Sequence, residues 1–383
     1  MGGMIETVDA LYVHVPFCLA KCSYCDFYSV PVRKDLVEGY LSALAGELAA
    51  RPMERPPRTV YVGGGTPSSL PEEAFRRLLA TIGAHIDRRR LAEWTVEANP
   101  ATELAARLGW MREAGVTRVS IGAQSLSERT LAFLGRLHSG PEARRAALAV
   151  REAGLELSVD LITAVPGQSK EEAQRDLEAL CEIAPGHASV YALSIEEGTP
   201  LKARVDAGEV TPLADDEAGE RILLAHDVLT ERGYEHYEIS NFALPGRRCR
   251  HNLTYWRNEA YLGVGPAAVS YIGGKRFKNP PDIQRYCALV TQGWQKGEEE
   301  TLGLAERARE TLILGLRLLD GVSREEFEKR TGVPLERICG GRIDPLVKGG
   351  FLRSEGDVVA LTRKALPVAD AVLVELLLDD VSP

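Results

Sequence analysis

Three cysteines stand close together near the start of the chain, in the stretch LYVHVPFCLAKCSYCDF from Leu11 to Phe27. Cys18, Cys22 and Cys25 follow a C-x3-C-x2-C spacing, directly after an apolar run that predicts a buried strand. Three thiols at this spacing can belong to a zinc knuckle, to half of a disulfide framework, or to the anchor of an iron–sulfur cluster.

Spacing and cysteine count favour the cluster. Structural zinc takes four ligands in paired short spacings, and no second Cys/Cys or Cys/His pair stands at a matching spacing. Disulfides are disfavoured because the seven cysteines are odd in number and the first residues, MGGMIETVDA, lack the basic and apolar regions of a signal peptide. A cluster held by three thiolates leaves one iron open to a chelating small molecule.

Composition limits the classes of function. The 383 residues are 45% hydrophobic and 26% charged, which is ordinary for a globular protein, and the net charge of −9 argues against nucleic-acid binding through a basic surface. No apolar run approaches the roughly 20 residues that span a bilayer. We therefore expect a cytoplasmic protein, in a reducing compartment.

The first half of the sequence alternates strand and helix patterns. Six strands are expected, starting at Leu11 and continuing at 59–62, 94–98, 118–122, 157–162 and 188–193, which predicts an α/β fold with a parallel sheet. We expect a barrel or an open partial barrel, because no G-x-G-x-x-G follows the first strand. Chemistry then collects at the C-terminal ends of the strands.

Unusual residues do stand at those strand ends. They are the glycines of 63–65, Glu97 and Asn99, Gln124 and Ser125, and Asp160. Any one of them is commonly a tight turn, a helix cap or a satisfied buried group. Their recurrence on successive strands favours a shared site.

The second half follows a different pattern. Residues 234–242, 251–256 and 261–271 are rich in strand formers and aromatics, and they predict two or more further strands or a hairpin. A charged linker is expected over 292–301. Beyond it, three helices, two short strands and a last helix resemble a winged helix, for which balanced charge favours a packing or lid role over DNA binding. The predicted division is thus 1–200, a barrel extension over 201–295 that carries the HNxxYW segment, and 302–375.

The cysteine spacing, with Tyr24 just before the third cysteine, resembles the radical S-adenosylmethionine (radical SAM) superfamily. That resemblance implies a partial (β/α)6 TIM-like barrel and a [4Fe-4S] cluster whose free iron is chelated by the amino and carboxylate groups of S-adenosylmethionine. The segments LYVHVPFC, VYVGGGTP, VEANP, RVSIGAQS, SVDLITAVPGQ, YEISNFA and HNLTYW extend the likeness over nearly the whole chain. They resemble the coproporphyrinogen dehydrogenase/HemW group, which joins a porphyrin-biosynthesis enzyme with a heme chaperone.

The resemblance also implies ligand-binding positions. Cys18, Cys22 and Cys25 fall on the cluster ligands. The positions that hold S-adenosylmethionine in the group are matched here by Tyr12, Tyr24, Gly64, Gly65, Thr66, Glu97, Gln124, Arg136 and Asp160.

Two departures distinguish the branches of this group. Phe27 stands where the dehydrogenase pattern has an additional cysteine, and the segment before the first strand is short. In addition, His251, Asn252, Tyr255 and Trp256 match the H-N-x-x-Y-W pattern of the HemW branch. All three features favour heme handling over oxidative decarboxylation.

Heme is therefore an expected cofactor, with His251 as the candidate iron ligand because imidazole is a standard axial ligand. A hydrogen-bonded core histidine is the alternative, and Cys249, Tyr255 and His236 remain other candidate ligands. The expected partners are heme, a heme acceptor of the respiratory chain and an electron donor for the cluster. A membrane-bound acceptor is one of the alternatives. A homodimer and a peripheral place at the inner face of the membrane stay open.

Two other functions stay in play beside the chaperone. One is oxygen-independent coproporphyrinogen III dehydrogenase, which would use the same radical machinery, although we expect no such activity here. The other is radical modification of RNA, which fits the acidic charge poorly.

Overall fold

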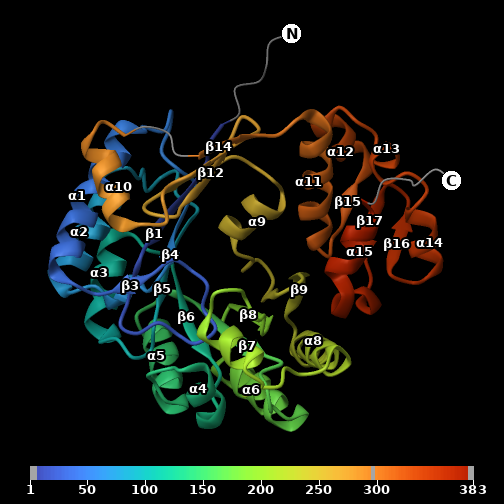
Figure 1. Cartoon of the computed structure of the whole chain (residues 1–383), viewed down its shortest axis with the longest axis horizontal. Helices are drawn as coiled ribbons and strands as arrows, with labels where there is room; N and C mark the ends of the chain where they lie inside the picture. Colours follow the sequence, from blue (N-terminus) through green and yellow to red (C-terminus); the bar gives the residue numbers. More distant parts are fainter. Residues whose placement is uncertain (1–6, 295–297, 378–383) are drawn as a thin grey trace.

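The computed structural model describes residues 7–294 and 298–377, and a twelve-stranded sheet lies at its centre. Six neighbouring strands of that sheet run parallel, namely β1 (Ala10–Val15), β4 (Thr59–Gly64), β5 (Glu93–Ala98), β6 (Arg118–Gln124), β7 (Glu156–Thr163) and β8 (His187–Ala192). The six strands and their parallel order confirm the prediction. The edge strands, β14 and β9, are not paired with each other in the described residues, so the barrel is open (Figure 1).

Helices cover the outer face of the parallel strands (Figure 1). They are α1 (Lys34–Ala50), α2 (Glu72–Gly83), α3 (Leu104–Ala114), α4 (Glu128–Leu134), α5 (Gly140–Glu152) and α6 (Lys170–Ile183). The sequence starts two of them with capping boxes, Ser139 with Glu142 and Ser169 with Glu172. Their apolar faces pack with strand residues such as Val60 and Val119, which are fully buried, into one core.

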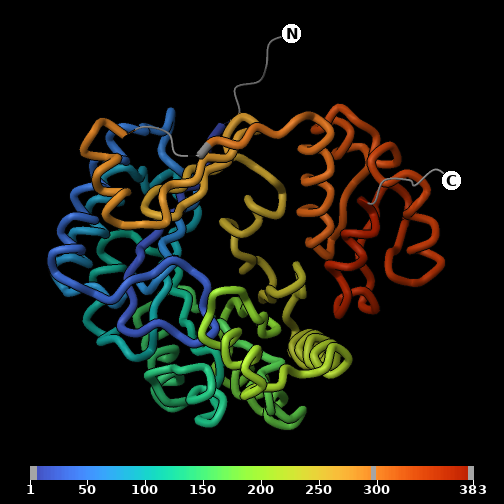
Figure 2. Tube along the Cα trace, in the orientation of Figure 1, coloured from blue at the N-terminus to red at the C-terminus, as the bar shows by residue number. Residues whose placement is uncertain are grey.

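The sheet continues beyond the parallel strands on both sides. Antiparallel β10 (Asn241–Ala243) and β9 (Glu235–Glu238) follow β8, while β11 (Tyr261–Val264) joins β1 in parallel and leads to β12 (Val269–Ile272), β13 (Lys275–Lys278) and β14 (Glu298–Thr301). Figure 2 shows the segments from β11 to β14 on the side of the first strand of the chain. Helices α7 (Pro200–Asp206), α8 (Asp215–Glu231) and α10 (Ile283–Thr291) complete this region.

Two sequence predictions differ from the structure here. The HNxxYW segment is not a strand but helix α9 (Arg250–Trp256). The Glu93 carboxylate accepts hydrogen bonds from the first two amide groups of this segment, which favours the start of a helix there. The predicted linker over 292–301 contains strand β14, which pairs with β13, although residues 295–297 of it lie outside the described part. The region 201–295 also shares its core with the barrel, since Leu229, Phe242 and Leu262 belong to the same buried cluster as the parallel strands.

The C-terminal module has its own apolar core, which includes Leu312, Phe327 and Leu361. Its elements are α11 (Leu304–Arg317), β15 (Val322–Ser323), α12 (Arg324–Thr331), α13 (Leu335–Cys339), α14 (Ile343–Lys348), β16 (Leu352–Glu355), β17 (Val358–Leu361), the 3₁₀ helix η2 (Arg363–Val368) and α15 (Ala369–Glu375). Helices followed by two short strands and a last helix were expected. Within the described residues, no helix combines the length and apolar character needed to cross a membrane.

Candidate functional site

One cavity of about 550 Å³ collects the sequence-predicted residues inside the barrel. Its lining includes all three cysteines of the loop and all nine positions matched to S-adenosylmethionine binding, Tyr12, Tyr24, Gly64, Gly65, Thr66, Glu97, Gln124, Arg136 and Asp160. His251 is not among the lining residues, although Asn252 and Tyr255 of the same helix are. A wider depression on the outer face between α2 and α3 contains none of these groups, so we place the site in the barrel.

The cysteine loop begins at β2 (Phe17–Cys18) and is tied to the barrel on several sides. His14 donates from Nε2 to the carbonyl oxygen of Tyr28 at 2.9 Å, across the base of the loop. Arg136 Nη1 lies 3.3 Å from Cys22 Sγ, and its Nη2 donates to the carbonyl oxygen of Gly122 at 2.6 Å. A guanidinium beside this sulfur stabilises negative charge on a group bound there.

The donor set fits an iron–sulfur cluster better than a single metal ion. Within the described ranges, no three Cys, His, Asp or Glu side chains converge closely enough to hold one metal ion. All seven cysteines are unpaired, so the loop is not part of a disulfide framework. Three thiols facing one cavity are the set that leaves an iron of a four-iron cluster open.

Glycines at the end of β4 let the backbone enter the site. Gly64 has φ +99°, and a Cβ placed on it would lie 2.3 Å from the ring of His14. A Cβ on Gly63 would lie 2.5 Å from the carboxyl carbon of Glu97. Glycine is therefore required at position 64, whereas a side chain at position 63 would displace the Glu97 carboxyl group; the turn brings the Gly64 amide within 3.2 Å of Glu97 Oε2.

Two carboxyl groups border the cavity from neighbouring strands. Glu97 accepts a hydrogen bond of 2.8 Å from the hydroxyl of Tyr61, and burial raises the pKa of Glu97 to about 7. Asp160 accepts from Ser120 Oγ at 3.0 Å, and burial raises the pKa of Asp160 to about 6. Both groups change charge near neutral pH, so they can meet the positive charges of an amino group or a sulfonium in this site.

The raised pKa of Glu97 predicts a pH effect on the cluster-free protein. The pKa of Glu97 is higher in the folded state than in the unfolded state, so its protonated form contributes to the free energy of unfolding. This contribution is fully present below about pH 4.5 and is lost as the pH rises through about 7. Glu97→Gln should keep an uncharged group there, and at pH 8 it should exceed the wild type in free energy of unfolding by on the order of 2 kcal/mol, allowing for cavity water. Urea unfolding at pH 5 and pH 8 measures the difference. Equal pH dependence in both proteins would contradict the assignment.

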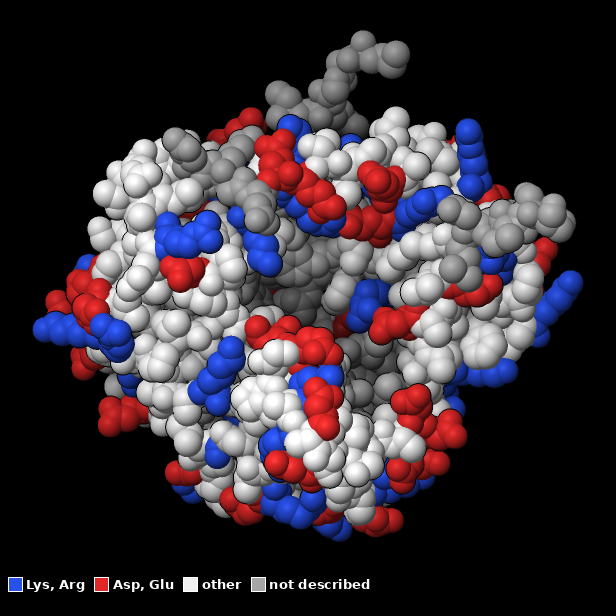
Figure 3. Space-filling view, in the orientation of Figure 1, with Lys and Arg blue, Asp and Glu red and all other residues white. Residues whose placement is uncertain are grey.

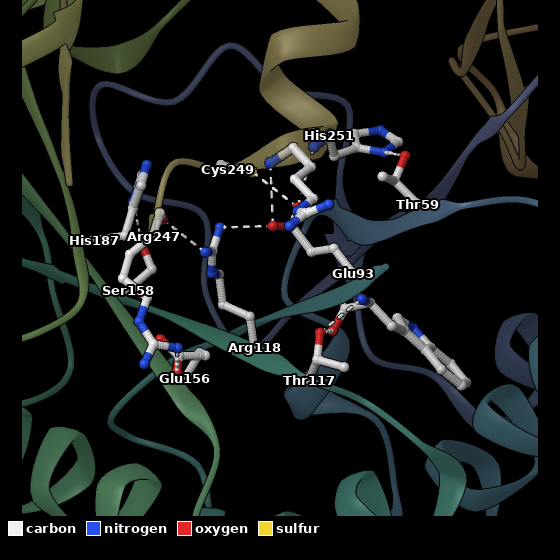
Figure 4. A network of polar contacts seen from close by, with 12 residues as sticks. Thr59, Glu93, Thr117, Arg118, Glu156, Ser158, His187, Arg247, Cys249 and His251 are labelled. Carbon is white, nitrogen blue, oxygen red and sulfur yellow. Dashed lines mark hydrogen bonds and ion pairs between the residues drawn. The ribbon is translucent and has the colours of Figure 1, made fainter. Parts of the chain in front are cut away.

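A buried ion pair closes the opposite end of the barrel, where the strands begin. Glu93, the first residue of β5, lies 3.0 Å from Arg118 Nη1 at the start of β6, and the two side chains are 5% and 7% exposed. Glu93 also accepts from the backbone amides of Arg250 and His251 at 3.1 Å, and from Cys249 Sγ at 3.3 Å. Figure 4 shows Glu93 and Arg118 pointing toward one another beneath the start of α9. The carboxylate thus caps α9 and fixes it as the floor of the barrel.

The residues predicted as heme-iron ligands lie at or beyond this floor. His251 is fully buried, and its ring nitrogens are 3.0 Å from Thr59 Oγ1 and 2.9 Å from the hydroxyl of Tyr255. Burial raises the pKa of Cys249, so its sulfur stays a protonated donor to Glu93. His236 also has both ring nitrogens engaged, with His226 at 2.8 Å and the carbonyl oxygen of Ile239 at 3.1 Å. In the conformation described, iron ligation by any of these side chains requires existing hydrogen bonds to break.

Several lining residues were not singled out from the sequence. They are Tyr61, Thr95, Arg118, Ser120, Ser158, His187, Ser189 and Tyr191. Apart from Tyr61, each lies two residues from another lining residue on the same strand, as Ser158 does from Asp160. This period of two, polar inward and apolar outward, was the available signal.

Comparison with known proteins places these features in context. Residues 12–180 match the radical SAM superfamily, and residues 302–368 match the HemN C-terminal domain. The heme chaperone HemW of Lactococcus lactis is 33% identical over 99% of this chain and 100% of the relative. HemW of Escherichia coli is 36% identical over 92% of this chain and 94% of that protein. The solved structure of coproporphyrinogen III oxidase (HemN) from Escherichia coli superposes with a TM-score of 0.83 at 20% identity, over 97% of this chain and 90% of the other, and shares the fold.

Proposed function

The chain belongs to the HemW family of the radical SAM superfamily, and from this premise we propose that it is a heme chaperone. It carries a [4Fe-4S] cluster, binds S-adenosylmethionine, takes up heme and delivers it to a protein of the respiratory chain. The observation that carries the proposal is identity of 33% and 36% to two HemW chaperones over nearly their whole lengths. Phe27 supports it, since a phenylalanine cannot supply the extra thiol of the dehydrogenase pattern.

The cavity residues divide the binding work. Cys18, Cys22 and Cys25 hold the cluster, which when bound to S-adenosylmethionine supplies an electron to the sulfonium. Glu97, held by Tyr61 and the Gly64 amide, is placed to orient a positively charged group. Arg136 keeps a positive charge beside Cys22. The burial of Asp160 keeps its carboxyl group ready to gain or lose a proton near neutral pH.

Cluster and heme have separate places in this proposal. The cavity of about 550 Å³ extends from the cysteine loop to α9, and S-adenosylmethionine would occupy the end near the cysteine loop. Ligand pockets of this size hold one small molecule, so a porphyrin is expected to bind outside the barrel. The C-terminal module and α8, which packs against it, offer that surface. Figure 3 shows a deep hollow between the module and the barrel.

Anaerobic heme titration of the reconstituted protein tests this function. We expect a heme absorbance band that saturates near one heme per chain. A dehydrogenase assay on the same preparation, with coproporphyrinogen III, reductant and S-adenosylmethionine, should give no protoporphyrinogen beyond a cluster-free control.

Two results would count against the proposal. A preparation with full iron content that shows no heme band would remove the chaperone function. Protoporphyrinogen formed over many turnovers would instead establish the decarboxylating enzyme, despite Phe27. Transfer of bound heme to a heme-free respiratory acceptor, followed by loss of the band from this protein, tests the delivery step.

A further inference from the structure

An axial heme ligand must present an unshared nitrogen lone pair that iron can reach. The chain has seven histidines. Four of them have both ring nitrogens hydrogen-bonded inside the protein, namely His14, His187, His236 and His251. In a fifth, His138, Nε2 binds the carbonyl oxygen of Ala123 and Nδ1 is buried. Two partly exposed imidazoles, His85 and His226, remain.

The hydrogen bonds of His226 fix its tautomer. His236 Nε2 lies 3.1 Å from the carbonyl oxygen of Ile239, which can only accept, so Nε2 of His236 carries the proton. A neutral imidazole with its proton on Nε2 has an unprotonated Nδ1, which can only accept. His226 Nδ1, 2.8 Å away, must then be the donor. With its proton on Nδ1, neutral His226 keeps a lone pair on Nε2, for which the described residues provide no protein partner.

This arrangement is the one that orients a metal-binding imidazole. Ligating histidines almost always donate their other ring nitrogen to a fixed acceptor, which sets the tautomer and the direction of the lone pair. His236 is itself held rigidly, because its ring stacks on Phe242 with centroids 4.0 Å apart and an interplanar angle of 16°. No comparable partner orients the side chain of His85 in the described part of the chain.

The surroundings of His226 also fit a porphyrin. Ile222 and Leu223 precede it by four and three residues on α8, so they lie on the same face of the helix and are partly exposed. That helix packs against η2, since a Cβ on Gly219 of α8 would lie 3.0 Å from Pro367 of η2. The next residue of η2, Val368, is 44% exposed. Arg363 of η2 pairs with Asp227 at 2.6 Å and is half exposed, so it adds a cationic group to this surface.

We propose that His226 Nε2 binds the heme iron, with His236 as the positioning residue behind it. The porphyrin then lies on the apolar surface formed by Ile222, Leu223 and Val368, between α8 and the C-terminal module. This inference rests on the proposed heme-chaperone function and names the binding site for it. His251 serves instead as a buried link between β4 and α9.

Heme titration of four variants of the reconstituted protein tests the assignment. His226→Ala should weaken heme binding at least about tenfold, and His236→Phe, which removes the acceptor, should weaken it by about 10–100-fold. His85→Ala is the matched control, a partly exposed histidine outside the site, and should bind as the wild type does. Free imidazole added to His226→Gly should restore the heme band, which loss of packing alone would not allow. Iron content and circular dichroism verify that each variant is folded.

The variant His251→Gln keeps two polar atoms in the buried position and provides the competing result. Heme binding lost there and unchanged in His226→Ala would overturn the proposal in favour of the HNxxYW segment. Loss in both variants would make His226 one of two ligands and support it. If the wild-type protein binds no heme, the chaperone function itself is rejected. If the wild type binds heme and His226→Ala binds it equally well, only the assignment of the ligand is rejected.

Discussion

Cys22→Ser is expected to abolish the brown iron–sulfur chromophore and to bring iron content near zero after anaerobic reconstitution. The three loop cysteines are the full protein ligand set of the predicted cluster, and a serine hydroxyl is a far poorer ligand for iron than a thiolate. Cys22 is also the sulfur beside Arg136, so its loss removes the contact of Arg136 Nη1, while Nη2 keeps its hydrogen bond to the carbonyl oxygen of Gly122. Iron analysis and visible absorbance measure the effect, together with loss of S-adenosylmethionine binding.

Cys181→Ser is the matched control. Cys181 is also partly exposed and unpaired, but it lies on α6 outside the cavity. Its variant should keep the full iron content and the chromophore. Retention of iron in Cys22→Ser would show that the ligands lie elsewhere.

Arg118→Leu is expected to lower the free energy of unfolding by about 3–5 kcal/mol, because it leaves the buried Glu93 carboxylate without its charged partner. The change also removes a hydrogen bond of 2.8 Å from Arg118 Nη2 to the carbonyl oxygen of Arg247, just before α9. Chemical unfolding measures the loss.

Two further variants separate charge burial from packing. The double variant Glu93→Gln, Arg118→Leu should recover part of the loss, because no unpaired charge then stays buried. Arg144→Leu breaks an exposed ion pair, because the Arg144 and Glu182 side chains are 45% and 61% exposed. This variant should lower the free energy of unfolding by less than about 1 kcal/mol. Equal losses at Arg118 and Arg144 would contradict the role given to the floor.

The sequence was sufficient to predict the parallel strands and the site residues at their C-terminal ends. The predicted strands at 94–98 and 157–162 carry residues that a core does not need, Glu97 and Asp160, and strand ends in such folds meet at one edge. The cysteine spacing added the cluster. All of these are local signals that need no knowledge of distant contacts.

The floor of the barrel could not be predicted in the same way. Aromatic and β-branched residues at 251–256 are typical of a strand, yet the segment is helical because Glu93, more than 150 residues earlier, accepts from its first amides. The pairing of His226 with His236 likewise depends on how α8 packs against β9. Propensity is a weak guide wherever a distant contact decides the structure.

The pairing of β1 with β11 also has a consequence for synthesis on the ribosome. Ala10 pairs with Tyr261, so one edge of β1 lacks its partner strand until about 250 more residues have been translated. At about 5–20 residues per second, that interval lasts on the order of 10–50 s. An unpaired apolar strand edge is prone to aggregation during that time. Because the cysteine loop follows β1 directly, the nascent chain exposes its three thiols beside this edge, so efficient production is expected to require chaperone protection before the cluster is inserted.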